Sequence, residues 1–430
     1  MSSILQRERF ASKAPLELGG ALQRRTLSVL VTATILGGLG MGASASVGAL
    51  LLAEVSGNDA ISGLGYAFSG AGAAIAGIPL ARIAGKRGRR VAMVLGSAIA
   101  MFGAITAIVG AAIGMWLVLA FGIGFLGVAQ AVQLLSRFSA ADLALPQNRA
   151  RDLSIVVWSI TVGAVIGPNL IAPGAVVGGW IGVTPLAGAF VFTVVAQLAA
   201  ALVNWFGLRP DPLLAARAIK AEADRVAEEA AKESGAPAPL AEYSATKTAK
   251  ILTIVMIAVA QAVMGGIMAM TPLHIMHHDG TEAIVGITLS FHIAGMYAVS
   301  PVFGILAGRL GRLPVIAIGW VILLAAVVVA YISGSNFVLV QIALTLIGLG
   351  WSAVTVAGAA LLTDLTNLDE RPTWQGRADT TMMAAGAGAG VLSGVVFAFA
   401  GFSFLALMGG VLLAIGVVCS LYPKLRVPKQ

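Results

Sequence analysis

The sequence predicts an all-α membrane protein with about twelve transmembrane helices in two pseudo-symmetric six-helix bundles. The first observation is composition: 58% of the 430 residues are hydrophobic and 11% are charged, whereas a soluble domain carries about 25% charged residues. The second is a series of apolar runs, each long enough to cross ~30 Å of hydrocarbon as a helix. The third is a set of motifs that recur at one spacing in the two halves of the chain.

The apolar runs form two sets of six expected spans. The first set lies near 26–53, 60–83, 91–109, 114–135, 153–177 and 185–208. The second set lies near 251–275, 283–307, 313–332, 337–362, 382–400 and 402–421. The first run is too long for a signal peptide, so we interpret it as a span. The chain therefore divides into a tail (1–25), an N-terminal bundle (26–208), a linker (209–250), a C-terminal bundle (251–421) and a second tail (422–430).

The positive charges predict the orientation in the membrane. If both termini face the cytoplasm, all 27 Lys and Arg fall on that side or at its helix ends, as expected for cytoplasmic loops. The opposite loops carry acids instead, including Glu54, Asp59 and Asp279. We therefore expect a multi-pass protein of the plasma or inner membrane, monomeric in the lipid bilayer. The net charge of +8 comes from loop anchors, so no nucleic-acid partner is predicted.

The linker is the one long polar segment between the two sets of spans. Its core, Leu213 to Lys232, is rich in Ala, Glu, Lys and Arg, which favour helix. Gly235, Pro237 and Pro239 then interrupt the pattern. We expect a cytoplasmic tether that is helical in part, with a regulatory docking site as the alternative.

A basic hairpin occurs in each half and marks an internal duplication. Gly85-Lys86-Arg-Gly88-Arg89-Arg90 follows the second span, and Gly304-x-x-x-Gly-Arg309-Leu-Gly311-Arg312 ends the eighth. Gly88 and Gly311 are 311 − 88 = 223 residues apart, and each supplies the positive φ that a tight reversal needs. The same shift pairs Gly163 with Gly386 and Gly167 with Gly390, and brings Asp142 within one residue of Asp364. Two related halves around a central cavity are typical of secondary transporters.

The two hairpins resemble the loops between spans 2 and 3, and between spans 8 and 9, of the major facilitator superfamily. Lys86, Gly88, Arg89 and Arg90 match that pattern in the first half, as do Gly304, Arg309, Gly311 and Arg312 in the second. The aspartate of the family's pattern is replaced by Gly85 and Gly308. The resemblance implies a transporter that works by alternating access.

The fifth span carries a second family-like motif, Gly163-x-x-x-Gly167-Pro168. Small residues four apart let two helices approach closely. The motif is similar to the one associated with exporters in this superfamily, although Ile171 and Ala172 replace its final glycine pair. It therefore favours efflux. Gly386 and Gly390 are the expected counterparts in the eleventh span.

Charged residues flank the hairpins at matching positions in the two halves. They are Asp142, Arg149, Arg151 and Asp152 after the fourth span, and Asp364, Arg371, Arg377 and Asp379 after the tenth. Ion pairs among such residues would close a cytoplasmic gate, with Lys86, Arg89, Arg309 and Arg312 as partners of the carboxylates. The alternative is a set of exposed pairs that contribute little.

Few ionisable residues fall inside the predicted spans. No Asp or Glu is expected at membrane depth, which leaves His292 as the best candidate for a coupled proton and Glu54 as the next. The alternative for His292 is a neutral ring bonded to a neighbouring carbonyl.

Neutral polar and soft side chains are the candidates for contact with substrate in the cavity. They are Gln130, Gln133, Asn169, Gln261, Met296 and Tyr297. Hydrogen bonds between helices are the alternative role for the amides. Met and His residues near 264–278 invite a copper interpretation, but without ligand spacing no metal site is predicted. Neither a cofactor motif nor a catalytic set is found, so an enzyme is not expected.

These observations predict a secondary transporter that moves a small, lipophilic molecule, with export by proton exchange favoured. Uptake of a nutrient or metabolite is the alternative, followed by a metal-ion substrate. A membrane sensor that transports nothing is the remaining class, but the linker is short for a folded soluble domain.

Overall fold

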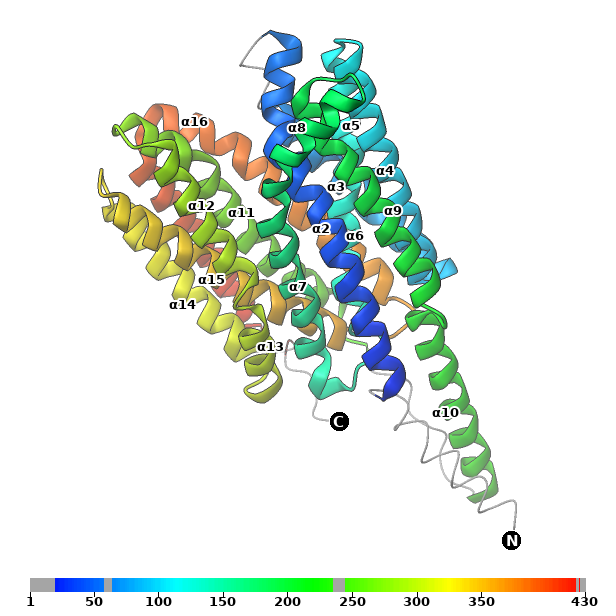
Figure 1. Ribbon diagram of the computed structural model, residues 1–430. Coiled ribbons are helices and arrows are strands. Elements are labelled where there is room, and N and C mark those ends of the chain that lie inside the picture. Colours follow the sequence, from blue (N-terminus) through cyan, green and yellow to red (C-terminus); the bar gives the residue numbers. More distant parts are fainter. Residues whose placement is uncertain (1–19, 58–63, 235–243, 423–424, 426–430) are drawn as a thin grey trace.

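The computed structural model describes residues 20–57, 64–234, 244–422 and 425, and every regular element in these ranges is a helix (Figure 1). The first bundle contains α2 (Ala21–Ser56), α3 (Leu64–Arg87), α4 (Arg89–Ala112), α5 (Trp116–Leu126), α6 (Val128–Ser139), α7 (Arg149–Ile166), α8 (Ile171–Trp180) and α9 (Ala189–Gly207). The linker helix is α10 (Pro212–Ser234). The second bundle contains α11 (Lys247–His277), α12 (Glu282–Tyr297), α13 (Ser300–Arg309), α14 (Arg312–Ile332), α15 (Phe337–Asp364) and α16 (Arg371–Ser420).

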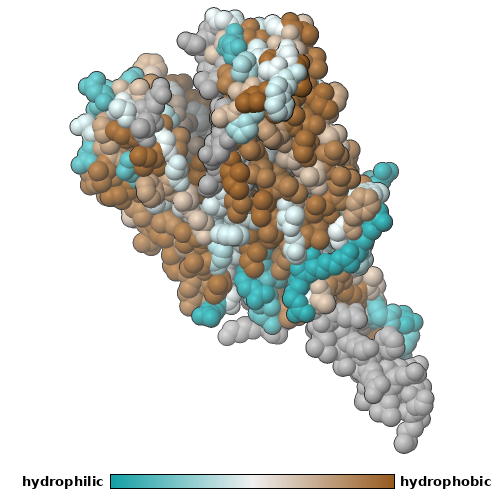
Figure 2. Space-filling model, in the orientation of Figure 1, coloured by the Kyte–Doolittle hydropathy of each residue, from teal (hydrophilic) through white to brown (hydrophobic). Residues whose placement is uncertain are grey.

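These helices make up the twelve predicted spans in two bundles. Three spans are divided, between α5 and α6, between α7 and α8, and between α12 and α13. The helix α16 contains two spans, because Gly401 with φ +75° interrupts it with a kink. Within the described ranges, nine helical segments are long and apolar enough to cross a membrane. Large apolar side chains such as Phe102, Phe121 and Val321 are exposed on the outer surface, which Figure 2 shows as a broad hydrophobic belt.

The two hairpins have the predicted geometry. Gly88 lies between α3 and α4 with φ +91°, and Gly311 lies between α13 and α14 with φ +98°. Residues with a side chain avoid this region of φ, so glycine permits the next helix to begin at once. As a result Arg89 and Arg312 are the first residues of α4 and α14.

The two bundles contact each other at one end, where Arg89, Arg149 and Arg312 lie; we call it the basic end. Here α3 packs on α16 and α7 packs on α13. Small residues bring the backbones together: a Cβ added to Gly376 would overlap Ala81, and one added to Gly304 would overlap Ser154.

Toward the other end the bundles diverge (Figure 1), and the space-filling view shows a notch between two lobes (Figure 2). We call this second end, where α2 and α11 finish, the opposite end. The cleft is therefore closed at the basic end and open at the opposite end.

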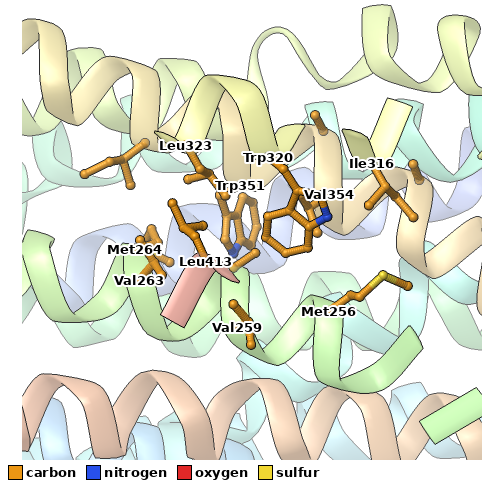
Figure 3. Close-up of a cluster of buried hydrophobic side chains, with 14 of the residues drawn as sticks. Met256, Val259, Val263, Met264, Ile316, Trp320, Leu323, Trp351, Val354 and Leu413 are labelled. Atoms are coloured by element: carbon orange, nitrogen blue, oxygen red, sulfur yellow. The ribbon is translucent and has the colours of Figure 1, made fainter. Parts of the chain in front are cut away.

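Each bundle has its own apolar core. The largest core fills the second bundle, where Trp320 and Trp351 lie among aliphatic side chains of α11, α14 and α16 (Figure 3). A smaller cluster crosses between the bundles, in which Phe138, Leu153 and Val157 meet Val356 and Ala359. This cluster gives the basic end an apolar seal in addition to its charged contacts.

Two helices extend further toward the basic end than their apolar runs. The helix of the eleventh span begins at Arg371, eleven residues before the expected start at 382, and that of the fourth span continues to Ser139. Both extensions carry polar residues that pack between the bundles and are therefore buried. One consequence is a buried carboxylate in the helix of the eleventh span: Asp379 lies inside α16 and is 5% exposed, although it precedes the apolar run at 382–400, in which no Asp or Glu was expected.

Candidate functional site

A buried ion pair lies at the start of α4. Arg89 Nε donates to Asp142 Oδ2 at 2.8 Å, and Nη2 donates to Oδ1 at 3.2 Å. Both side chains are fully buried. Two parallel bonds of this kind fix the planar guanidinium in one orientation. Arg89 was expected to bind one of the carboxylates that flank the hairpins, and Asp142 is the one it binds.

Arg89 also reaches across to the second bundle. Its Nη2 donates to Gln375 Oε1 at 2.6 Å, and Gln375 Nε2 donates to Thr363 Oγ1 at 3.3 Å. Sequence reasoning missed Gln375. The sequence does contain a signal for it. Gln375 is four residues before the predicted gate residue Asp379, so the two share one face of α16.

A second buried ion pair joins α6 to α16. Arg137 Nη2 lies 2.5 Å from Asp379 Oδ1, with side chains 3% and 7% exposed. The guanidinium carbon of Arg137 also lies 4.9 Å from the ring centre of Phe138. Arg137 was not among the predicted gate residues, because it follows the apolar run of the fourth span.

The second half repeats the first ion pair. Arg312 Nε lies 3.0 Å from Asp364 Oδ2, and Arg149 Nη1 of the first bundle lies 2.9 Å from Oδ1 of the same carboxylate. Arg312 Nη2 also donates to the carbonyl of Pro146 at 2.9 Å. Asp364 therefore binds one arginine from each bundle.

Arg151 pairs with the adjacent Asp152 at 2.9 Å, and four other predicted gate cations lie outside this network. Arg90 stacks over Trp205 at 4.8 Å, and Arg377 stacks over Trp374 at 4.9 Å. Lys86 and Arg309 are exposed, and no ion pair involving either is found among the described residues. Their expected pairing with the gate carboxylates is therefore not seen.

The beginning of the linker helix binds both bundles. Asp211 caps α10 by accepting from the amides of Leu213 and Leu214 at 3.1 and 3.2 Å, and it also accepts from the Arg90 amide at 2.7 Å. Arg217 Nη1 donates to the Gly85 carbonyl at 2.7 Å, and its Nε lies 3.3 Å from Asp369 of the second bundle. The first turns of α10 are thus held against the basic end.

A further charged contact lies at the start of α16. Lys250 Nζ lies 2.5 Å from Glu370 Oε1, and Trp374 Nε1 donates to Oε2 at 3.0 Å. Partial burial acts to raise the pKa of Glu370, but hydrogen bonds from Lys250, Ser244 and Trp374 outweigh it and lower that pKa.

The predicted cavity residues occupy both bundles. Gln130 donates to Ser69 at 3.4 Å, whereas the Gln133 side-chain nitrogen is buried without a partner. Gln261 accepts from Trp351 Nε1 at 2.7 Å, and the ring of Tyr297 meets that of Trp351 edge-on at 5.8 Å.

Met296 is buried in the core of the second bundle, and the side chain of Asn169 lies outside the described residues. A substrate-contacting role for these side chains stays a prediction.

The two predicted proton carriers lie in different environments. His292 is fully buried, its Nδ1 lies 2.8 Å from the carbonyl of Leu344, and its Nε2 has no partner. Glu54 is exposed near the end of α2. Their coupling role stays a prediction.

The glycine motifs lie at helix crossings. A Cβ added to Gly163 would be 2.5 Å from the backbone of Gly38, and one added to Gly386 would be 2.8 Å from Gln261 Nε2. Gly390 has open space at the same position. Gly167 begins a short 3-10 turn (Gly167–Leu170), and the side chain of Pro168 is not described.

Three histidines lie together at the opposite end, in the second bundle. His274, His277 and His278 line a cavity of about 780 Å³ with Met270 and Phe402. The His274 ring stacks on Phe402 at 4.2 Å, and its Nε2 lies 2.8 Å from the Gly334 carbonyl. Within the described part of the chain, no three His, Cys, Asp or Glu are arranged to hold a metal ion.

Comparison with known proteins agrees with this architecture. The family described as the Major Facilitator Superfamily matches residues 30–281 and 254–430. The chain is 37% identical to the uncharacterized MFS-type transporter YdeG of Bacillus subtilis (strain 168) over 398 residues, 91% of this chain and 90% of the relative.

Two further similarities are more distant. The riboflavin transporter RfnT of Brucella anthropi is 26% identical, over 86% of this chain and 88% of the relative. The crystal structure of the human organic anion transporter MFSD10 (TETRAN) superposes with a TM-score of 0.71 at 14% identity, covering 93% of this chain and 99% of that one.

Proposed function

This chain belongs to the major facilitator superfamily and is a membrane transporter of that type, and we propose that it exports a small, lipophilic molecule in exchange for protons. Export and proton exchange rest on the partial exporter motif of the fifth span and on titratable groups buried between the bundles.

We place the basic end in the cytoplasm. The distribution of Lys and Arg supports this placement, because the outermost residues of the other end include Glu54 and Asp279. With this orientation the cleft opens to the outside, and both termini lie in the cytoplasm.

The charge network at the basic end then acts as the cytoplasmic gate. The observation that carries this proposal is Arg89, whose buried side chain binds Asp142 in its own bundle and Gln375 in the other. Arg149 with Asp364 and Arg137 with Asp379 also join the two bundles. Alternating access requires these contacts to break together when the cleft opens to the cytoplasm.

The uncharged side chains near the helix crossings support the proposal that the substrate is neutral. Gln133 and Gln261 lie beside Gly38 and Gly386, which belong to equivalent crossings of the two bundles. Carboxamides bind a ligand by hydrogen bonds without demanding a charge of either sign. We propose that they contact substrate, as do Gln130, Asn169, Met296 and Tyr297.

Uptake is the second candidate function. It is favoured by the similarity to a protein named as a riboflavin transporter. We therefore include riboflavin among the compounds to be tested.

The test is transport by the purified protein in liposomes. An imposed pH gradient, acidic on the face of the opposite end, should drive lipophilic substrates from the basic end toward the opposite end. The panel contains neutral and cationic dyes and riboflavin. Movement that ignores the gradient, or that follows the proton flow, would contradict proton-coupled export.

A further inference from the structure

One ion pair lies at the boundary between the closed end and the open cleft. Along α16 the residues that meet α3 are Pro372, Gly376 and Thr380, and Thr380 Oγ1 donates to the carbonyl of Ala74 at 3.4 Å. Further along the same face of α16 as Asp379, Gly390 has no atom within 4 Å of its Cβ position. Asp379 is next to Thr380, and it therefore lies at the cleft end of these contacts between α16 and α3.

The bonding of this pair is incomplete. Arg137 donates a single bond, from Nη2, to Asp379, and Arg137 Nε is buried without a partner. Arg89 makes more bonds, two to Asp142 and a third to Gln375, although its Nη1 is also buried without a partner. A buried pair is stable only if its geometry and its further hydrogen bonds offset the loss of water. The Arg137–Asp379 pair is the weaker of the two by this criterion.

Neutralising Asp379 would leave Arg137 in apolar surroundings. Phe138 lies beside it and belongs to the cluster in which Leu153 and Val157 meet α15. An unpaired guanidinium in such a place is very unfavourable. It can recover water only if α6 moves away from α16, and that movement opens the gate.

The other charges around Asp379 already have partners. On α4, Arg89 faces it and is bound to Asp142. On α11, Lys250 is bound to Glu370, and on α15, Asp364 binds Arg149 and Arg312. The nearby residues of α3, including Ala74, Gly77 and Ala81, carry no charge. Arg137 is thus the cation that depends on the charge of Asp379.

We propose that Asp379 binds the coupled proton and that its protonation opens the gate at the basic end. This inference rests on the proposed exchange of protons for substrate and names the residue that performs it, in addition to the candidates His292 and Glu54. Protons reach Asp379 through the cleft, and they are released on the other side once the bundles have moved. The deprotonated carboxylate then binds Arg137 again and closes the gate.

The experiment measures the opening of the gate in the absence of substrate. Spin labels on cysteines at Arg87 and Thr373, which are exposed on α3 and α16, report the separation of the bundles in nanodiscs. The native Cys419 is first replaced by serine. Between about pH 8 and about pH 5 we expect the ratio of open to closed protein to rise by about tenfold. Asp379→Asn should be open at both pH values, and Asp379→Glu should keep the response.

Two further variants make the result decisive. Asp224→Asn makes the same chemical change on the exposed part of α10 and should leave the response intact. His292→Ala should also respond. If Asp379→Asn still responds, if the parent protein shows no response, or if His292→Ala alone removes it, the inference is wrong. Failure of transport in liposomes with an intact response would instead contradict the proposed export.

Discussion

Arg89 and Arg312 are equivalent residues of the two halves. Arg89 binds Asp142, which follows the fourth span, and Arg312 binds Asp364, which ends the tenth. Their Nε atoms lie 2.8 and 3.0 Å from Asp142 and Asp364. Each arginine directly follows a glycine with positive φ, so the same local geometry aims both side chains inward. The environments differ, because Asp142 is fully buried and Asp364 is 14% exposed.

Replacing Arg89 should destabilise the protein more than replacing Arg312. In Arg89→Gln the buried Asp142 loses its cation, and removing one partner of such a pair costs about 3–5 kcal/mol. In Arg312→Gln, Asp364 keeps Arg149. Thermal unfolding in detergent measures the difference in stability. Equal losses of stability in the two variants would contradict the claim that burial makes the Arg89–Asp142 pair more important. If both variants fold, we expect transport to fall while equilibrium binding of substrate stays near normal.

The orientation can be tested by chemical labelling of intact cells. In a protein lacking Cys419, a cysteine at His278 should react with an impermeant thiol reagent from outside. A cysteine at Glu228, on exposed α10, should react only after the cells are opened. Reaction with the reverse sidedness would contradict the placement of the basic end in the cytoplasm.

The helix crossing at Gly163 should not tolerate a side chain. In Gly163→Ala the new Cβ would lie 2.5 Å from the Gly38 backbone, and overpacking of this kind costs about 1–3 kcal/mol. Gly388→Ala is the matched control, because its Cβ meets nothing within 4 Å and Ala favours helix by up to about 1 kcal/mol. Unfolding temperatures should therefore fall for the first variant and hold or rise for the second. The opposite order would contradict a close contact between the helices at Gly163.

Glu370 should make stability depend on pH in the acidic range. Its pKa is lowered, with burial opposing and the bonds from Lys250, Ser244 and Trp374 prevailing. The stabilisation is present above the unfolded-state pKa of about 4.3 and is lost as the pH falls through the lower, folded value. The difference in unfolding temperature between the parent and Glu370→Gln should shrink over that interval. A difference that grows toward low pH would contradict this sign.

The repeat in the sequence was sufficient to predict the hairpin glycines, and it predicted carboxylate partners for Arg89 and Arg312 without saying which aspartate binds which arginine. Both depend on local geometry and on positions that recur at one spacing. Arg137 and Gln375 could not be predicted in the same way, because each binds a partner in the other half. Such partners depend on how the two bundles meet, and both residues lie in helical turns outside the apolar runs at 114–135 and 382–400. Asp379 was predicted as a gate residue, but its burial inside α16 follows from the same extension.

Arg89 and Arg312 each bind an acceptor in the opposite bundle, but the two acceptors are of different kinds. This difference affects how readily a mutation can remove each contact. Arg89 binds the side chain of Gln375, so one nucleotide change at that codon can remove the contact. Arg312 binds the main-chain carbonyl of Pro146, an atom that every amino acid at that position would supply. Random substitution therefore weakens the first contact readily and the second only by displacing the backbone. Variation among descendants of this gene should accumulate unevenly over the two halves of the gate.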